Sequence, residues 1–294
     1  MKVVLGPASR ELGEKTAELS GLETVGVAYK AFPDGESYVR LEGSVRDEHV
    51  VIVQTTSAPQ DSRLMQLAFL AGASKRNGAC KVTAVVPYLG YARQDKMFLE
   101  GEGVSVETVA CMLNAAGVDS LVTVNIHAEA ALKKFPFPAK TLSAIPLLAE
   151  YFVEKGYGKA FALAPDKGAM YIAEQAQRVL GGGAGHLEKK RDRYTGQTTQ
   201  TGEGLKVKGQ PVIIFDDIIS TGGTIVGAAK ILRELGAANI FTACVHPVLV
   251  GDAEQRILGA GVDEVVGTDS VPSHVSKVSL APLIAKALKA QESG

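Results

Sequence analysis

Short apolar runs rich in β-branched residues alternate along the chain with longer segments in which apolar residues recur at helical spacing. The strand-like runs at 50–53, 82–86 and 121–126 are separated by helical patterns at 61–77 and 104–115. Such alternation is typical of βαβ units, in which helices connect parallel strands. The pattern therefore predicts an α/β protein with mostly parallel sheets flanked by helices.

The same rhythm resumes after a proline-rich stretch at 133–146, which we take as a domain boundary. A strand-like run at 50–54 leads through a loop and a helix to the run at 78–87, and 211–215 leads in the same way to 236–247. Nearly equal spacings of this kind indicate a duplicated α/β unit. We predict two domains, 1–143 and 144–275, followed by a strand and helix at 276–294 that pack back on the body.

Composition and charge narrow the range of partners. The 294 residues include 31 Lys and Arg against 32 Asp and Glu, so no overall field favours nucleic acid or a membrane surface. No apolar run approaches the roughly 18 residues that a membrane helix needs. No basic and then apolar leader follows Met1. We expect a cytoplasmic protein that binds neither nucleic acid nor membrane.

The three cysteines lie far apart in the sequence. Cys80, Cys111 and Cys244 each stand among apolar neighbours and lack the close spacing of a zinc or dithiol motif. We expect all three to be buried and to act as small apolar side chains.

The stretch VIIFDDIISTGGT at 212–224 combines two acids with a glycine-rich turn. It lies between a strand-like run, 212–215, and a helical pattern at 225–235. At the carboxyl end of a parallel strand, such a turn can present backbone N–H groups and hydroxyls to a phosphate. Asp216 and Asp217 can only accept hydrogen bonds when ionised, which suits ribose hydroxyls or a hydrated cation. A helix cap alone would explain one acid and one hydroxyl. The stretch therefore predicts a sugar-phosphate site.

This stretch resembles the ribose 5-phosphate loop of the phosphoribosyltransferase fold, in a form similar to that of the ribose-phosphate pyrophosphokinases (PRPP synthetases), especially archaeal ones. The resemblance implies two tandem phosphoribosyltransferase-type domains. It also implies transfer of the pyrophosphoryl group of ATP to the 1-hydroxyl of ribose 5-phosphate, which gives PRPP and AMP, with Mg2+ as cofactor. The residues so assigned to ribose 5-phosphate are Asp216, Asp217, Ser220, Thr221, Gly222, Gly223 and Thr224.

Two segments of the first half are similar to the ATP-binding segments of that family. FPDGE at 32–36 is expected to be a turn, and PYLGYARQDK at 87–96 follows a strand-like run. Read alone, they could be a plain hairpin turn and a solvated charged loop. The resemblance implies that the ring of Phe32 stacks on adenine and that the polyphosphate is held by the second segment. The residues so assigned to ATP are Phe32, Asp34, Glu36, Arg93, Gln94, Asp95 and Lys96.

Two further strand ends match the family's metal and pyrophosphate motifs. The resemblance implies that His127 and Asp166 help to hold Mg2+, and that Asp166, Lys167 and Gly168 form the pyrophosphate loop. A lone His at a strand end is otherwise more often a structural residue.

The polar stretch 188–204 is expected to be either a mobile functional loop or an exposed hairpin. The resemblance makes Lys189 and Arg191 the catalytic cations that neutralise the transferring group. It also implies that the adenine loop comes from a neighbouring subunit, so that a homodimer is the smallest active unit.

Several positions depart from the family pattern. Asn125 stands where an Asp is common, Lys167 and Ala169 change the pyrophosphate loop, and Met97 replaces a frequent base; the string 103–105 lacks a common proline. These changes leave two alternatives open. The first is a phosphoribosyltransferase that consumes PRPP, and the second is a catalytically silent regulatory subunit of PRPP synthetase type.

Overall fold

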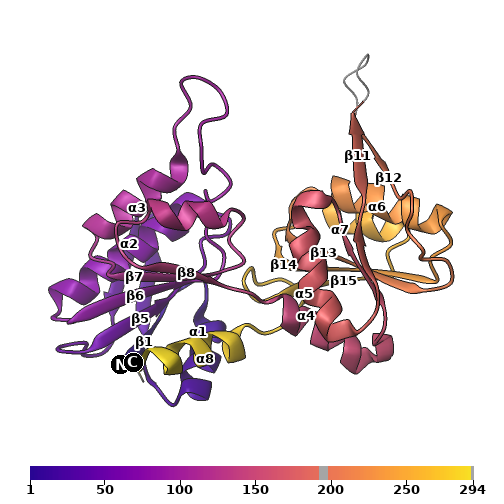
Figure 1. Cartoon of the computed structure of the whole chain (residues 1–294). Coiled ribbons are helices and arrows are strands. Elements are labelled where there is room, and N and C mark those ends of the chain that lie inside the picture. Colours follow the sequence, from indigo (N-terminus) through magenta and orange to yellow (C-terminus); the bar gives the residue numbers. More distant parts are fainter. Residues whose placement is uncertain (192–197, 293–294) are drawn as a thin grey trace. The chain divides into compact units, whose positions relative to one another are not determined.

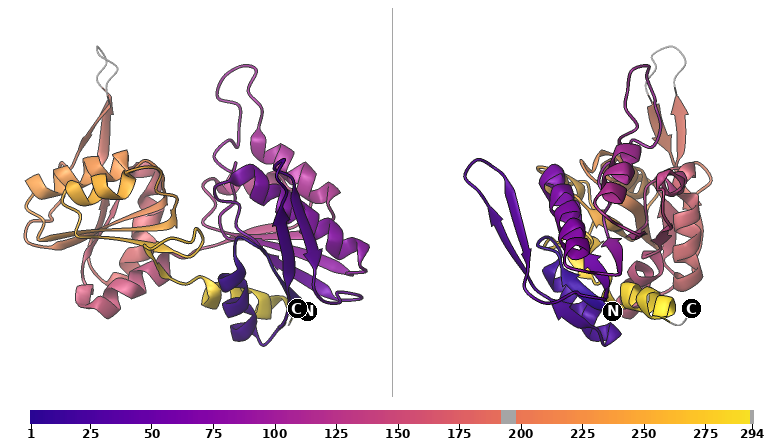
Figure 2. Two further views of the ribbon diagram at one scale, coloured as in Figure 1. Left: turned by 180° about the vertical axis from the view of Figure 1, so that it is seen from behind. Right: turned by 90° about the vertical axis from the view of Figure 1, so that its left-hand side faces the viewer.

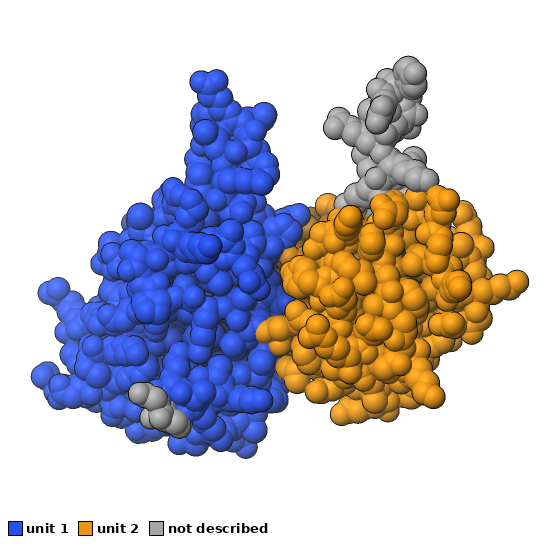
Figure 3. Space-filling view, in the orientation of Figure 1, with its two compact units in different colours: residues 1–142, 279–294 blue, residues 143–278 orange. Residues whose placement is uncertain are grey.

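The structure, a computed structural model, describes residues 1–191 and 198–292. The chain divides into two compact units, shown in separate colours in Figure 3. Unit 1 comprises residues 1–142 together with 279–294, and unit 2 comprises residues 143–278. Each unit is built on one six-stranded sheet in which every strand pair is parallel. The predicted α/β class is therefore confirmed.

The sheet of unit 1 has the strand order β2-β1-β5-β6-β7-β8. Its strands are β1 (Lys2–Leu5), β2 (Glu23–Val25), β5 (His49–Val53), β6 (Lys81–Val86), β7 (Ser120–Val124) and β8 (Ala139–Leu142). Its helices are α1 (Arg10–Ser20), α2 (Gln60–Arg76), α3 (Ser105–Ala115) and α8 (Ala281–Glu292). Helices α2 and α3 cover one face of the sheet, and α1 and α8 pack together on the other (Figure 1).

Burial on both faces explains the continuous apolar runs of the central strands. In β5, residues 50–53 are all inaccessible to solvent, and so are Leu67 and Leu70 of α2, which packs above them. An antiparallel hairpin, β3 (Val27–Ala31) and β4 (Ser37–Leu41), lies along α2 and projects from the body of unit 1 (Figure 2, right).

The sheet of unit 2 has the strand order β10-β9-β13-β14-β15-β16. Its strands are β9 (Phe161–Ala164), β10 (Ala184–His186), β13 (Pro211–Ile219), β14 (Asn239–Pro247), β15 (Glu264–Thr268) and β16 (Ser276–Val278). Its helices are α4 (Ile145–Phe152), α5 (Met170–Leu180), α6 (Gly223–Glu234) and α7 (Ala253–Gly259). Helices α6 and α7 lie on one face and α4 and α5 on the other (Figure 1). A second antiparallel hairpin is formed by β11 (Glu188–Arg191) and β12 (Thr198–Thr201).

The two sheets repeat one topology. In chain order, β1, β2, β5, β6, β7 and β8 occupy the same places in the first sheet as β9, β10, β13, β14, β15 and β16 in the second. The topology therefore supports the duplication that the spacing of the strand-like runs predicted. In particular, β5 and β13 hold the same central position in their sheets, and the next element of each sheet's flanking layers is a helix, α2 after β5 and α6 after β13.

The proline-rich stretch contains β8, a strand that we did not predict, which pairs with β7; the division between the two units also falls within this stretch. Two expectations about local structure were wrong. Strand β13 continues to Ile219 and so includes the two acids that we expected after the strand. Cys80 and Cys111 are exposed, and only Cys244 is buried.

Among the described residues, no helix is both long enough and apolar enough to cross a membrane.

Candidate functional site

The two acids of the glycine-rich stretch lie on β13 beside the central strand β14. Asp216 is opposite Cys244, and Ile218 is opposite His246. The Oδ1 atom of Asp216 accepts the N–H of Asp217 at 2.9 Å, and Oδ1 of Asp217 accepts the N–H of Ile218 at 2.8 Å. Each acid thereby fixes its own rotamer against the backbone that follows it.

Burial raises the pKa of Asp216 well above its usual value, and the charges of Asp217 and Asp166 raise it further. Three carboxylates of unit 2 thus lie close enough to repel one another. A bound cation, or hydroxyl groups that donate to these carboxylates, would relieve this repulsion. No cluster of three or more His, Cys, Asp and Glu side chains suited to hold a metal occurs within residues 1–191 and 198–292.

The turn after β13 leads directly into α6. Gly222 adopts a left-handed backbone with φ of 76°, and a methyl group there would lie 2.9 Å from Cδ1 of Ile257. Gly223 differs, because an added methyl would meet no heavy atom within 4 Å. In the described structure no side chain caps α6. Its first N–H groups are therefore left without a side-chain acceptor, as anion binding at a helix start requires.

The predicted pyrophosphate loop follows β9, the neighbour of β13 in the same sheet. Asp166 precedes a 3-10 turn over Lys167–Ala169, and its Oδ1 accepts the N–H of Ala169 at 3.2 Å. Lys167 and Gly168 are exposed at the turn. The alanine in place of a family glycine thus donates its N–H to the loop's acid, a bond that a glycine would make equally well.

The predicted adenine loop is the turn of the β3–β4 hairpin, as expected from the sequence. The N–H of Phe32 donates to the carbonyl of Glu36 at 2.8 Å, and Asp34 Oδ1 accepts the N–H of Glu36 at 3.2 Å. The ring of Phe32 is 38% exposed, and the Nζ of Lys30 lies 4.7 Å from its centroid. The loop therefore presents an accessible aromatic face at its tip.

The second segment predicted to bind ATP follows β6 and begins the long loop between β6 and α3 (Figure 1). Arg93 and Lys96 are exposed, and Gln94 and Asp95 are partly buried. The Nε2 of Gln94 donates to Oε2 of Glu102 at 3.2 Å; the same oxygen accepts the N–H groups of Phe98 and Leu99. These backbone bonds lower the pKa of Glu102. Glu102, which we did not single out from the sequence, thus organises the loop around the segment.

The residues around the proposed metal motif of unit 1 follow β7. Asn125 is buried and has a positive φ of 35°, a conformation in which Asn and Asp are enriched. Its N–H donates to the carbonyl of Leu142 at 2.8 Å. His127 is exposed two residues further on. The positive φ at the end of β7 therefore accounts for an Asn at position 125 on structural grounds.

The predicted residues are thus divided between the units. Unit 1 carries the Phe32–Glu36 turn, the Arg93–Lys96 segment and His127, and unit 2 carries Asp166 and the 216–224 stretch. Lys189 and Arg191 belong to β11, but their side chains lie outside the described part of the structure, as do residues 192–197 between β11 and β12.

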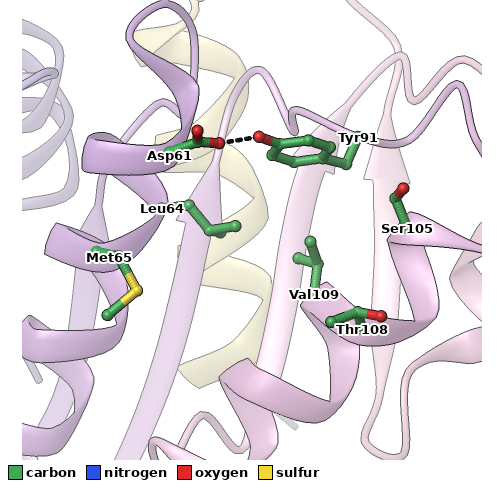
Figure 4. Close-up of a pocket in the computed structure, with 7 residues that line it drawn as sticks. All are labelled: Asp61, Leu64, Met65, Tyr91, Ser105, Thr108 and Val109. Carbon is green, nitrogen blue, oxygen red and sulfur yellow. Dashed lines mark hydrogen bonds between the residues drawn. The ribbon is translucent and has the colours of Figure 1, made fainter. Parts of the chain in front are cut away.

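Sequence reasoning also missed a contact between segments 30 residues apart. The hydroxyl of Tyr91 donates a hydrogen bond to Oδ1 of Asp61 in the first turn of α2. The two side chains border a pocket of about 330 Å³ that is also lined by Leu64 and Met65 of α2 and by Ser105, Thr108 and Val109 of α3 (Figure 4). No local pattern identifies this pair; only the match of Tyr91 to a family motif drew attention to its segment.

The duplicated parallel sheets and the acidic glycine-rich turn at a strand end define a protein of the phosphoribosyltransferase-type fold class. A sequence model of the N-terminal domain of ribose phosphate pyrophosphokinase matches residues 1–117, and one of the phosphoribosyl synthetase-associated domain matches residues 201–287. The chain belongs to the ribose-phosphate pyrophosphokinase family.

Full-length relatives and a solved structure support this membership. The chain is 42% identical to a ribose-phosphate pyrophosphokinase of Methanobrevibacter smithii, over 98% of this chain and 99% of the relative. It is 44% identical to one of Methanothermobacter thermautotrophicus, over 96% and 98%. The crystal structure of phosphoribosylpyrophosphate synthetase from Mycobacterium smegmatis superposes with a TM-score of 0.88 at 32% identity, and the match covers 100% of this chain and 99% of that one.

Proposed function

We propose that particular residues of this chain carry out the reaction of its family. That reaction makes PRPP from ATP and ribose 5-phosphate. The oxygen of the 1-hydroxyl attacks the β-phosphorus of ATP, the bond from that phosphorus to the oxygen of the α-phosphate breaks, and AMP leaves. The hydroxyl gives up its proton, and the pyrophosphoryl group moves intact. As in other phosphoryl transfers, positioning and charge neutralisation supply most of the rate.

Unit 2 binds the sugar phosphate in this proposal. The observation that carries it is the uncapped start of α6 beside two carboxylates: N–H groups for the 5-phosphate, and acceptors for the ribose hydroxyls. Gly222 sets the turn, Gly223 leaves room for the phosphate, and Ser220, Thr221 and Thr224 add hydroxyls.

Mg2+ fits the same residues. The raised pKa of Asp216 shows that its negative charge is disfavoured without a cation, and Mg2+ is commonly held by one or two carboxylates together with substrate phosphates. We therefore propose that Asp166 helps to hold Mg2+ and that Asp216 and Asp217 bind the ribose hydroxyls and part of the hydrated Mg2+ shell. The assignment of His127 of unit 1 to Mg2+ rests on the family resemblance. When bound, Mg2+ would neutralise charge on the transferring phosphates.

ATP is assigned to the two segments of unit 1. The accessible ring of Phe32 would stack on adenine, while Asp34 and Glu36 accept from its amino group. Arg93 and Lys96 would bind the polyphosphate, with Gln94 and Asp95 placed between them. Lys189 and Arg191 would stabilise charge on the β-phosphate in the transition state. The cytoplasmic location expected from the sequence remains part of this proposal.

Product analysis tests the reaction. With ATP, ribose 5-phosphate and Mg2+, we expect AMP and PRPP in equal amounts, whereas ADP would indicate transfer of a single phosphoryl group. Replacing Lys189 by Ala is expected to lower kcat at least about tenfold, because one cation at the transferring group is lost. The neighbouring Lys190→Ala variant serves as control. If Lys189→Ala and Lys190→Ala behave alike, the catalytic role of Lys189 is wrong.

We also propose a homodimer, in which the adenine loop serves the neighbouring subunit. The hairpin supports it, because Tyr29, Phe32 and Tyr38 are each about 40% exposed, and exposed aromatic residues are enriched at interfaces. Analytical ultracentrifugation is expected to give a mass of at least twice 30.8 kDa. Full activity at a concentration where only monomer sediments would contradict the proposal.

A further inference from the structure

The segment that carries Arg93 is fastened to the loop between β5 and α2. The N–H and the Oγ1 of Thr56 both donate to the carbonyl of Tyr88 at 2.9 Å, and the same Oγ1 accepts the N–H of Gly90 at 2.7 Å. The Tyr91 hydroxyl completes the set by donating to Asp61. Four hydrogen bonds thus join residues 54–61 to residues 88–91.

The last of these bonds is made by a residue with an uncommon backbone conformation. Tyr91 has a positive φ of 68°, which is rare for a bulky side chain and persists only where the surroundings impose it. The carboxylate of Asp61 raises the pKa of the Tyr91 hydroxyl, so the hydroxyl keeps its proton and remains a donor at neutral pH. The ring of Tyr91 meanwhile reaches across the pocket toward α2 (Figure 4).

Asp61 is itself firmly placed. It stands in the first turn of α2, a helix anchored by Leu64, Leu67 and Leu70, which are at most 8% exposed. The bond therefore ties the side chain of Tyr91, two residues before Arg93, to a helix that is packed on the first sheet.

These hydrogen bonds are made by the loop between β5 and α2, which corresponds in unit 1 to the proposed sugar-phosphate turn between β13 and α6 in unit 2. The register of the sheets puts Gln54, after β5, at the position of Asp216, after Phe215 of β13. Gln54 is fully buried: its Oε1 accepts the N–H of Ala8 at 3.0 Å, and its Nε2 donates to Oε1 of Gln66 at 3.1 Å. In unit 1 this position is thus filled by a buried glutamine with partners of its own, and Thr56 of the same loop holds the neighbouring segment.

We propose that Asp61 is a positioning residue for ATP, which through its hydrogen bond to Tyr91 sets the backbone of residues 91–96. The inference rests on the proposed role of this segment in ATP binding. Asp61 touches no reacting atom. It fixes the conformation from which Arg93 and Lys96 reach the polyphosphate, so its loss should weaken ATP binding and leave the sugar-phosphate site of unit 2 intact.

The test compares Tyr91→Phe, which deletes one hydroxyl, with Asp61→Asn and the double variant. We expect KM for ATP to rise about tenfold in either single variant, as for the loss of a hydrogen bond to a charged group. The KM for ribose 5-phosphate should stay within twofold of the unmodified protein. The KM for ATP of the double variant should be no higher than that of the more impaired single variant, because both substitutions break the same hydrogen bond. Tyr157→Phe, which deletes one tyrosine hydroxyl outside the proposed sites, is the matched control.

Calorimetric titration with a non-hydrolysable ATP analogue gives an independent readout, since it needs neither ribose 5-phosphate nor turnover. The proposal is overturned if the affinity for the analogue is unchanged in both single variants. It is also overturned if KM for both substrates rises together with a fall in Tm, which would mean that the bond only stabilises the fold. If the unmodified protein forms no AMP, the proposed function fails, whereas the analogue titration still decides the role of Asp61.

Discussion

Asp216→Asn is expected to make the ligand-free protein more stable and nearly inactive. The carboxylate of Asp216 is disfavoured by burial and by the charges of Asp217 and Asp166. An amide of the same shape removes that cost, so the free energy of unfolding at neutral pH should rise by about 1–2 kcal/mol. Activity should fall on the order of a thousandfold, because the charge proposed to hold Mg2+ and the ribose is lost.

The pH dependence follows from the direction of the shift. The pKa of Asp216 is higher in the folded protein than in the unfolded chain, so the folded form binds the proton more tightly. The stability from this group is fully present below the unfolded pKa and is lost as pH rises through the folded pKa. Thermal unfolding should therefore show stability falling over that window in the unmodified protein, and a weaker fall in Asp216→Asn.

Thermal unfolding with added Mg2+ tests whether Asp216 itself holds the cation or whether Mg2+ acts on the charge of the protein in general. Above the folded pKa of Asp216, Mg2+ should raise the Tm of the unmodified protein and have little effect on Asp216→Asn. Asp252→Asn, which changes an exposed acid of the same unit, should respond to Mg2+ like the unmodified protein. An equal rise of Tm in all three proteins would show that Asp216 does not hold the cation.

Replacing Gly222 by Ala is expected to lower the stability of the protein, whereas replacing Gly223 by Ala is expected to weaken ribose 5-phosphate binding without loss of stability. At Gly222 the positive φ of 76° and the 2.9 Å approach to Ile257 should lower the free energy of unfolding by about 2–3 kcal/mol. At Gly223 the methyl meets nothing, and a helical alanine should keep or raise stability by about 0.4–1 kcal/mol. The same methyl would occupy the space proposed for the 5-phosphate.

Steady-state kinetics and denaturant unfolding check this pair. Gly223→Ala should raise KM for ribose 5-phosphate on the order of a hundredfold and leave KM for ATP unchanged. Gly259→Ala in α7 serves as control, since that glycine also has open space around it and no positive φ, and lies outside the proposed site. A Gly223→Ala enzyme with a normal KM for ribose 5-phosphate would refute phosphate binding at the start of α6.

The fold and the glycine-rich turn before α6 were predictable because their signals are local. Continuous β-branched runs indicate strands buried on both faces, and β5, β6 and β13 lie where those runs do. Two acids followed by two glycines at a strand end carry their own chemistry. Strand β8 was missed because three nearby prolines hide a run that only pairs with β7 through the sheet.

The cysteine prediction failed for a reason that the sequence contains. On α3, the residues Val106, Val109, Ala110 and Leu113 form the buried face. Cys111 lies on the opposite side of the same helix, so its apolar neighbours in sequence are not its neighbours in space. The Asp61–Tyr91 bond was beyond prediction, because nothing in either segment specifies a partner 30 residues away.

The two copies of the central turn suggest how duplication allowed this chain to specialise. In unit 2 the stretch keeps two neighbouring carboxylates, one of them disfavoured by burial, and a glycine at positive φ. In unit 1 a buried glutamine closes the equivalent position with bonds of its own. At this one position the second repeat therefore carries charge that the proposed ligand would use, while the first repeat carries an amide that serves packing. Selection on the first copy should accordingly act on packing, and selection on the second on chemistry.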